Sequence, residues 1–190
     1  MKVAAVTFAL GVSLLPMVVR AAPPAAAPDD VVSFDGQTLV LAARGENAGE
    51  QVMEFIPAGE TLETWSRLAS VRVYDKSFDP KALAGGLVKQ VKKAFPQAPC
   101  ALVENAEAGA VIVDFVIIPA DGSLAEFNIF KYWRMPDGQV VAEQYAVRRR
   151  GDVRGFLARD LEPLRKRLLP LMAEEGLRLG EPAEAAAPDR

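Results

Sequence analysis

Three acidic side chains lie in or beside apolar, strand-like segments, where each could act as a general acid or base. Asp114 lies within the run VIVDFVII, and Glu126 and Glu143 lie in the two segments that follow. Apolar surroundings raise the pKa of a carboxyl group, and two carboxyl groups about 5 to 9 Å apart form the active site of many glycoside hydrolases. No spacing in the sequence enforces such a pair, and an edge or solvent-facing position explains Asp114 equally well.

Other catalytic chemistries are excluded by composition. The 190-residue chain has no histidine and one cysteine, Cys100. It therefore lacks the Ser-His-Asp and Cys-His nucleophile arrangements and the usual His-containing zinc sites. Cys100 cannot form a disulfide within the chain, and its apolar surroundings favour a small buried thiol. No EF-hand pattern or glycine-rich phosphate loop is present, so we expect no metal ion and no cofactor.

A binding face is predicted on the hairpin formed by residues 125–134 and 139–148. If Asp137-Gly138 is a two-residue loop, Phe130 lies opposite Tyr145, and one face combines aromatic, charged and amide groups. Such a mixture is expected where a sheet binds a small polar ligand or a peptide. The alternative is that the rings lie under a helix and the charges pair at the rim. The predicted binding residues are Asn128, Phe130, Tyr132, Arg134, Glu143 and Tyr145.

A basic surface is predicted on the C-terminal helical segment. Its members are Arg154, Arg159, Arg165, Lys166 and Arg167. Such a surface could contact anionic lipid headgroups, lipopolysaccharide or an acidic partner protein. It could equally be a solvated helix face balanced by nearby acidic residues. The overall net charge of −3 disfavours nucleic acid as a partner.

The N-terminus resembles an export signal. Residues 1–21 combine an early lysine, an apolar run and a small residue at the expected cleavage point, which predicts a signal peptide. An exported chain without disulfides fits the bacterial periplasm, with no transmembrane span in the mature protein. An uncleaved helix that tethers the protein to the membrane is the alternative. Residues 22–30 predict a Pro/Ala spacer, residues 31–179 a single domain, and residues 180–190 a disordered acidic tail.

The first half of the domain is predicted to be mainly extended. Asp35-Gly36 predicts a tight turn between two short strands, and Glu50–Ile56 predicts a third strand. Thr61 can cap a short helix that carries Trp65, and Val71–Tyr74 predicts a further strand.

Helices and a meander complete the predicted fold. Asp79-Pro80 is a strong helix start, since the carboxylate can accept from free amides and proline suits the first helical position. The pair Gly85-Gly86 indicates close backbone packing or a later start. A second helix is predicted at 153–175, kinked or divided at Pro163. Three strands are predicted at 110–118, 125–134 and 139–148. We expect an α+β fold, with a mostly antiparallel sheet of about six to seven strands and two main helices packed on it.

Residues 54–65, EFIPAGETLETW, resemble a segment of uncharacterised exported bacterial proteins, in which a strand leads through a Gly-Glu turn to a tryptophan-bearing helix. The order of elements is similar to the Mog1/PsbP-like sandwich. The resemblance implies architecture only, because fold does not transfer function. We expect an exported, non-enzymatic protein that binds a partner protein or a cell-envelope component. The alternatives are an envelope hydrolase with a carboxylate pair and a membrane-tethered accessory protein.

Overall fold

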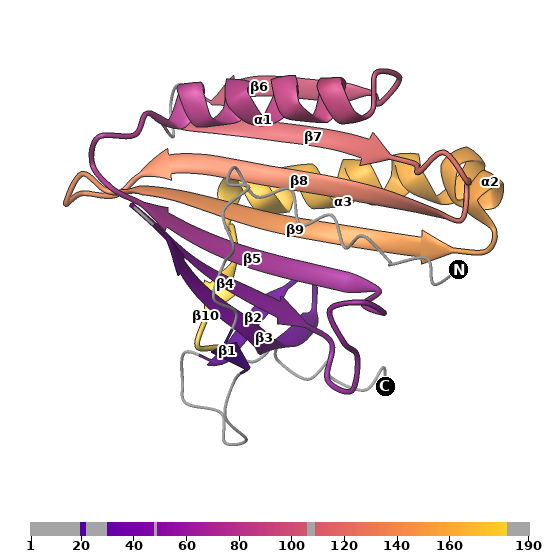
Figure 1. Cartoon of the computed structure of the whole chain (residues 1–190), viewed down its shortest axis with the longest axis horizontal. Helices are drawn as coiled ribbons and strands as arrows, with labels where there is room; N and C mark the ends of the chain where they lie inside the picture. The colour runs from indigo at the N-terminus through magenta and orange to yellow at the C-terminus, as the bar shows by residue number, and fades with distance from the viewer. Residues whose placement is uncertain (1–19, 22–29, 48, 106–108, 182–190) are drawn as a thin grey trace, which may run out of the picture.

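The computed structural model describes residues 20–21, 30–47, 49–105 and 109–181. In this part of the chain, ten strands form one antiparallel sheet in the order β10-β2-β3-β4-β5-β9-β8-β7-β6, with β1 paired to β3 (Figure 1). The α+β class is correct, but the predicted number of six to seven strands is wrong. The strands are β1 (Arg20–Ala21), β2 (Val31–Phe34), β3 (Gln37–Asn47), β4 (Glu50–Ile56), β5 (Arg67–Tyr74), β6 (Cys100–Asn105), β7 (Ala110–Ile117), β8 (Leu124–Arg134), β9 (Val140–Arg150) and β10 (Arg178–Leu179).

The strands that sequence patterns missed are very short or lie at an edge. β1 and β10 have two residues each, too few for an alternating pattern to appear. β6 ends the sheet, and its apolar residues Leu102 and Val103 are both exposed. Because β6 does not alternate between apolar and polar residues, it lacks the usual signal of a half-buried strand.

The tight turn between β2 and β3 confirms the prediction made from Asp35-Gly36. Asp35 and Gly36 both have positive φ angles, 51° and 67°. Phe34 pairs directly with Gln37, so the loop contains two residues. Positive φ at both central positions matches the right-handed twist of the flanking strands.

The first long helix also forms where the sequence predicts it. α1 (Pro80–Ala94) begins with Pro80 in its first turn, and Asp79 Oδ1 accepts a hydrogen bond of 2.8 Å from the Ala82 amide. This bond satisfies one of the amides that have no partner within the helix. Leu87 and Val91 are buried against the sheet.

The C-terminal helical segment is divided. It consists of α2 (Val153–Gly155), a π-helical segment η2 (Phe156–Asp160) and α3 (Leu161–Glu174). Pro163 lies in the first turn of α3 and cannot donate to the Arg159 carbonyl four residues earlier. The wider π turn therefore lies where the regular hydrogen-bond ladder is interrupted.

The sheet curls into a half-barrel around α3, and this gives it an inner and an outer face (Figure 1). On the inner face, side chains from β2, β3, β4, β5, β9, β8 and β7 share one hydrophobic core with α3, including Phe34, Phe127 and Leu168. On the outer face, α1 packs on β7 and β8, and its Leu87 belongs to one core cluster with Phe130. We call the α3 side the inner face and the α1 side the outer face throughout.

The register of the β8–β9 hairpin differs from the prediction by one residue. Arg134 pairs with Val140, rather than with Val141 as a two-residue loop requires. The Met135 amide donates to the Gln139 carbonyl at 2.8 Å, which leaves a three-residue loop between them. Such a loop combines a turn with a left-handed residue, and Gly138 supplies that conformation with φ of 96°. A one-residue slip turns every side chain of one strand to the opposite face.

The segment between β4 and β5 also corrects a prediction. Residues 61–64 form a turn rather than a helix, with the Trp65 amide donating to the Thr61 carbonyl at 2.9 Å. Leu68 already belongs to β5, so no residues remain for a helix. Trp65 is buried in a small outer-face cluster with Ile56, Leu68 and Ala146.

Most of the predicted signal peptide, spacer and tail lies outside the described residues. The described parts of these segments are residues 20–21, Asp30 and residues 180–181. No helix among the described residues is both long enough and apolar enough to span a membrane.

Candidate binding groove on the inner face

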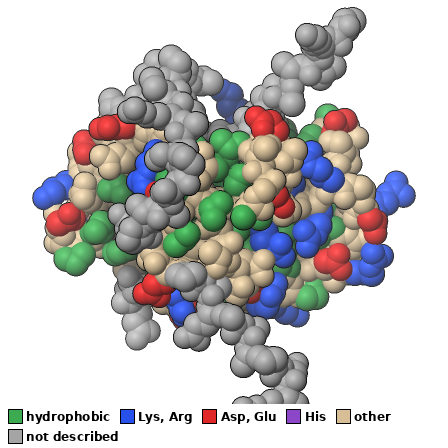
Figure 2. Space-filling model, turned by 90° about the horizontal axis from the view of Figure 1, so that it is seen from below, with side chains coloured by type: hydrophobic (Ala, Val, Ile, Leu, Met, Phe, Trp, Pro, Cys, Tyr) green, Lys and Arg blue, Asp and Glu red, His purple; other side chains and the backbone are tan. Residues whose placement is uncertain are grey.

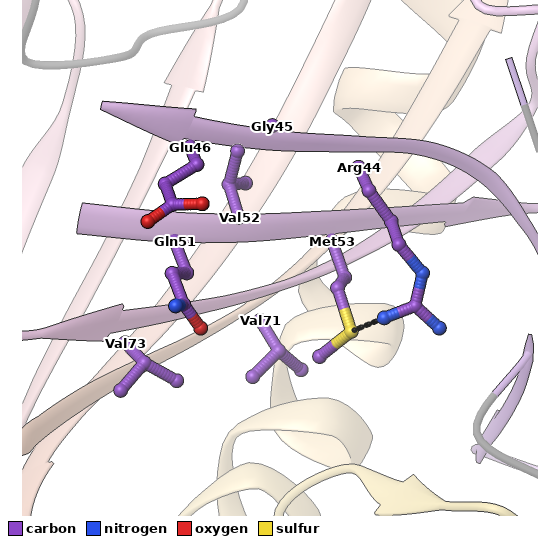
Figure 3. A pocket seen from close by; sticks show the side chains of 8 residues that line it. All are labelled: Arg44, Gly45, Glu46, Gln51, Val52, Met53, Val71 and Val73. Carbon is purple, nitrogen blue, oxygen red and sulfur yellow. Dashed lines mark hydrogen bonds between the residues drawn. The ribbon is translucent and has the colours of Figure 1, made fainter. Parts of the chain in front are cut away.

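A groove lies on the inner face of β3, β4 and β5. Its floor comes from two rows of directly paired residues, because paired residues on neighbouring strands point to the same face. In one row Val73 of β5 pairs with Gln51 of β4, and Gln51 pairs with Glu46 of β3. In the other, Val71 pairs with Met53 and Met53 with Arg44. Figure 3 shows these side chains converging on one space.

The groove has the size and composition of a ligand site. Its volume is about 460 Å³, within the usual range for small-molecule pockets. The residues that line it are Arg44, Gly45, Glu46, Gln51, Val52, Met53, Val71 and Val73. Apolar side chains form the floor, and charged and amide groups stand toward β3. The groove can therefore hold an apolar group and orient a polar one beside it.

Arg44 forms the polar wall of the groove. Its guanidinium donates to Met53 Sδ at 3.1 Å and to Asp30 Oδ1 at 2.9 Å. The Arg44 side chain is half exposed, while that of Asp30 is largely buried. Asp30 thus holds a positive charge beside the flexible, polarizable thioether of Met53.

Glu143 of β9 extends the row of Val71 toward β8. It pairs with Val71 on one side and with Lys131 on the other. Burial raises the pKa of the Glu143 carboxyl, although Lys131, the Leu177 amide and the Trp133 indole act in the opposite direction. Glu143 Oε2 accepts a hydrogen bond from the Leu177 amide at 3.3 Å, just after α3. Its role here is to fix the end of α3 beside the groove.

The predicted binding face is divided between the two sides of the sheet. Phe130 and Tyr132 lie on the outer face, buried in the cluster beneath α1. Tyr145 lies on the inner face, 1% exposed, with its ring centroid 4.7 Å from that of Phe34. The six predicted residues therefore do not form one site. The prediction of a common face is wrong because the predicted pairing of β8 with β9 was shifted by one residue.

Arg134 has a structural role near the start of α1, where it binds backbone carbonyl groups. Its guanidinium donates to the carbonyl oxygens of Gly138 and Phe78, each at 2.7 Å, and to that of Lys76 at 3.3 Å. These bonds join the β8–β9 loop to the segment that leads into α1. They use three of the five N–H donors of the guanidinium, which holds Arg134 in a structural contact.

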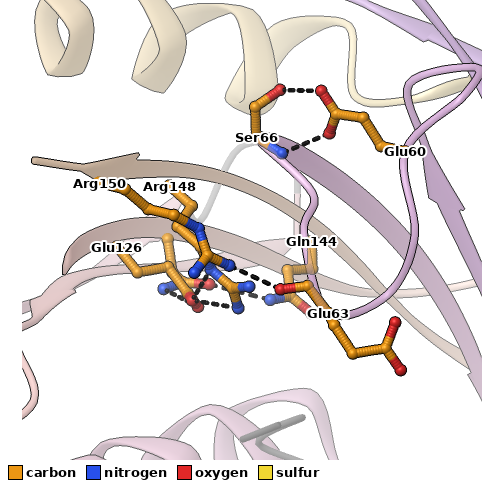
Figure 4. A network of polar contacts seen from close by, with 8 residues as sticks. Glu60, Glu63, Ser66, Glu126, Gln144, Arg148 and Arg150 are labelled. Carbon is orange, nitrogen blue, oxygen red and sulfur yellow. Dashed lines mark hydrogen bonds and ion pairs between the residues drawn. The ribbon is translucent and has the colours of Figure 1, made fainter. Parts of the chain in front are cut away.

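Asn128 belongs to a buried polar network on the outer face with Glu126, Gln144 and Arg148, the three members labelled in Figure 4. It donates to Glu126 Oε1 at 3.1 Å and accepts from Gln144 at 2.9 Å. Arg148 donates twice to Glu126 Oε2, at 2.9 and 3.1 Å, and its guanidinium lies 3.5 Å from the centroid of the Trp65 ring. Because these groups satisfy one another, the network fixes strand packing.

The three acidic residues considered for acid–base chemistry lie apart. Asp114 is on the inner face of β7, bound to Arg165 of α3, whereas Glu126 is on the outer face of β8. Glu143 shares the inner face with Asp114 but lies two strands away, and two strand spacings are about 10 Å. No group of three or more Cys, Asp or Glu residues in the described ranges could hold a metal ion.

Four of the five residues of the predicted basic surface are paired with acidic residues. Arg165 binds Asp114 at 2.6 Å, Arg167 binds Asp35 at 2.9 Å, Arg159 binds Asp152 at 2.9 Å and Lys166 lies 3.4 Å from Glu162. Arg154 is exposed beside them. Figure 2 shows basic and acidic side chains interspersed on one face of the molecule. This distribution leaves little uncompensated charge for an anionic surface.

The groove residues were missed because their site depends on pairing between distant segments. The strands 50–56 and 71–74 were both predicted, and Val71 and Val73 have the two-residue spacing of one strand face. That spacing could have indicated a shared apolar floor. The sequence does not show which part of the inner face α3 leaves uncovered.

A protein-family model matches residues 26–176, and because this range exceeds half of the chain, the protein belongs to that family. The matched range includes β3, β4 and β5, so the groove lies within the family domain. No curated protein and no solved structure matches the chain. Membership of the family assigns neither ligand nor activity.

Proposed function

We propose that this protein is an exported, non-enzymatic binding protein that holds the apolar part of a cell-envelope molecule in the inner-face groove. The observation that carries this proposal is the open space of about 460 Å³ floored by Met53, Val71 and Val73. Burying an alkyl segment there removes apolar surface from water, at roughly 0.8 kcal/mol per methylene group.

The polar wall suggests an amphipathic ligand. Arg44 and Glu46 place opposite charges along the same strand, with the amide of Gln51 beside them. A molecule with an alkyl chain and a polar headgroup satisfies both parts of such a site. We propose amphipathic lipids or their fragments as the ligand class, which matches a cell-envelope component.

Binding is favoured over hydrolysis by the positions of the carboxylates. Asp114 is occupied by Arg165, and Glu143 accepts from the Leu177 amide. Among the described residues, neither stands beside a second carboxyl group in an open site, as an acid–base pair requires.

The groove is tested by filling it. Val73→Trp adds a large ring to the floor, and Lys89→Trp adds the same ring to the exposed face of α1 as a matched control. The probe is a fluorescent naphthylamine, which brightens in apolar sites, displaced by lauric acid. We expect Val73→Trp to weaken probe binding at least about tenfold and Lys89→Trp to leave it unchanged.

Equal binding by both variants would contradict the groove as the site. Unfolding curves for each variant separate loss of the site from loss of the fold. If the wild-type protein neither brightens the probe nor releases it to lauric acid, the amphipathic ligand class is wrong.

Export is tested separately. The full-length chain is expressed in a bacterial host, and the N-terminus of the protein from the periplasmic fraction is sequenced. We expect cleavage after Ala21. A protein that retains Met1 and sediments with membranes would support the tethered alternative instead.

A further inference from the structure

The two edges of the sheet differ in whether another described strand covers the edge. At one edge, β10 covers part of β2, with Arg178 paired to Ser33 and the Gly180 amide donating to the Val31 carbonyl at 3.0 Å. At the other edge, β6 pairs with β7, and no other described strand lies beside it. An uncovered edge presents free backbone donors and acceptors to any extended chain that reaches it.

β6 lacks the features that usually protect an edge strand. It contains no proline or lysine, and its pairing with β7 runs without a bulge from Cys100 to Asn105. Leu102 is 38% exposed and Val103 is 59% exposed, so its two largest apolar side chains are available to a partner. Its one charged residue, Glu104, is paired with Lys81 of α1 at 2.7 Å. Such an edge is suited to strand addition.

We propose that β6 is a self-association edge, which pairs antiparallel with β6 of a second copy of this chain and joins the two sheets. A twofold axis perpendicular to the sheet relates antiparallel edge strands and keeps each face on its own side. Residues that pair across the two strands point to the same face, whereas neighbouring residues of one strand point to opposite faces. The pair at the axis must therefore consist of the same residue from each copy.

The side chains favour Leu102 as that central residue. Leu102 then meets Leu102 of the second copy, and each Val103 meets Ala101 of the other copy, so both exposed apolar side chains gain apolar neighbours. Glu104 lies opposite Cys100, away from the other Glu104. Centring the pair on Glu104 would instead place two like charges opposite each other, which is unfavourable.

α1 is positioned to leave this edge accessible. It packs on the outer face, mainly over β7 and β8, and does not pair with the backbone of β6. A five-residue strand pair is at the small end of protein interfaces, and we therefore expect weak dimers that form as protein concentration rises.

Charge exchange at the central position tests the register directly. Leu102→Lys and Leu102→Glu each place like charges opposite each other in a homodimer, and a mixture of the two variants places opposite charges there. We expect wild-type protein to dimerise in sedimentation velocity over about a hundredfold concentration range. We expect each variant alone to associate at least about tenfold more weakly, and the mixture to recover association.

Leu179→Lys is the matched control, because Leu179 is 42% exposed on β10 at the opposite edge. We expect this variant to dimerise like wild type. A cross-linking variant provides a second readout: with Cys100→Ser, Leu102→Cys should form a disulfide-linked dimer on mild oxidation, since paired residues on antiparallel strands lie within disulfide range.

Three results would overturn the proposal. In the first, the wild-type chain stays monomeric across the whole concentration range. In the second, the mixture of folded charge variants does not associate. In the third, Leu179→Lys weakens dimerisation as much as the Leu102 variants do. Circular dichroism of each variant establishes that it is folded. Because the groove and β6 lie on different strands, loss of dimerisation leaves lauric acid binding unchanged, and the two proposals fail separately.

Discussion

The guanidinium of Arg165 on α3 holds the carboxylate of Asp114 on β7 through two hydrogen bonds, 2.6 and 3.1 Å long. The Asp114 side chain is 9% exposed, and that of Arg165 is 38% exposed. The acidic residue within an apolar strand therefore positions the helix that fills the half-barrel.

Removing either partner of this pair should weaken the docking of α3 on the sheet and lower the free energy of unfolding. We expect Arg165→Met to cost about 2 kcal/mol of unfolding free energy, because it leaves a buried carboxylate without its partner. Asp114→Asn should cost less, since it also removes the buried charge. Urea unfolding of both variants and the double variant measures the coupling between them. Additive costs would show that the pair does not stabilise the docking of α3.

Buried and exposed ion pairs should differ in their contribution to the free energy of unfolding. Glu126 and Arg148 are both largely buried, whereas Lys81 and Glu104 are both exposed. We expect Glu126→Gln to cost about 2 to 3 kcal/mol, because the buried Arg148 charge loses its carboxylate. Glu104→Gln should cost less than about 0.5 kcal/mol. Equal urea midpoints for the two variants would contradict the assignment of a structural role to the buried network.

Glycine substitutions should act in opposite directions at two sites. A Cβ on Gly85 in α1 would meet no atom of the described residues within 4 Å, so Gly85→Ala should stabilise the protein by about 0.5 to 1 kcal/mol. Gly138 has a φ of 96°, which alanine adopts poorly. Gly138→Ala should therefore destabilise the protein by about 1 to 2 kcal/mol. Thermal unfolding measures both effects, and a destabilised Gly85→Ala variant would indicate packing against α1 that the structure lacks.

Stability should depend on pH through Glu143. Burial raises the pKa of its carboxyl above the ordinary value of 4.5, so the folded protein binds this proton more tightly than the unfolded chain does. The contribution of this group to stability is therefore present at low pH and is lost as pH rises from about 4.5 through the folded pKa.

Glu143→Gln removes this dependence, while its side-chain oxygen can still accept from the Leu177 amide. We expect the stability of the variant relative to wild type to be more favourable at about pH 8 than at about pH 4. Chemical unfolding at the two pH values measures this difference. A relative stability that is the same at both pH values, or more favourable at acidic pH, would contradict the effect of burial.

Local chemistry made part of this fold predictable. Asp35-Gly36 specifies a tight turn because both positions require positive φ, and Asp79-Pro80 specifies a helix start through a side-chain cap and a fixed φ. These features depend on a few neighbouring residues. They were therefore accessible without knowledge of the rest of the chain.

The hairpin register and the groove were less predictable from the sequence. Pro136-Asp137-Gly138 is compatible with loops that differ by one residue, and that difference decides whether Glu143 shares a face with Tyr132. The groove depends on the pairing of β3, β4 and β5 and on the part of the sheet that α3 covers. Such long-range relationships are not encoded in the spacing of any single segment.

The hydrogen bond from the Gly180 amide to the Val31 carbonyl joins the two ends of the folded domain, although 149 positions separate them in the sequence. This contact can form only after nearly the whole domain has been synthesised, and contacts of such long range slow folding. The same closeness makes the domain suited to circular permutation, with a short peptide bridging the old ends and new termini opened in a surface loop.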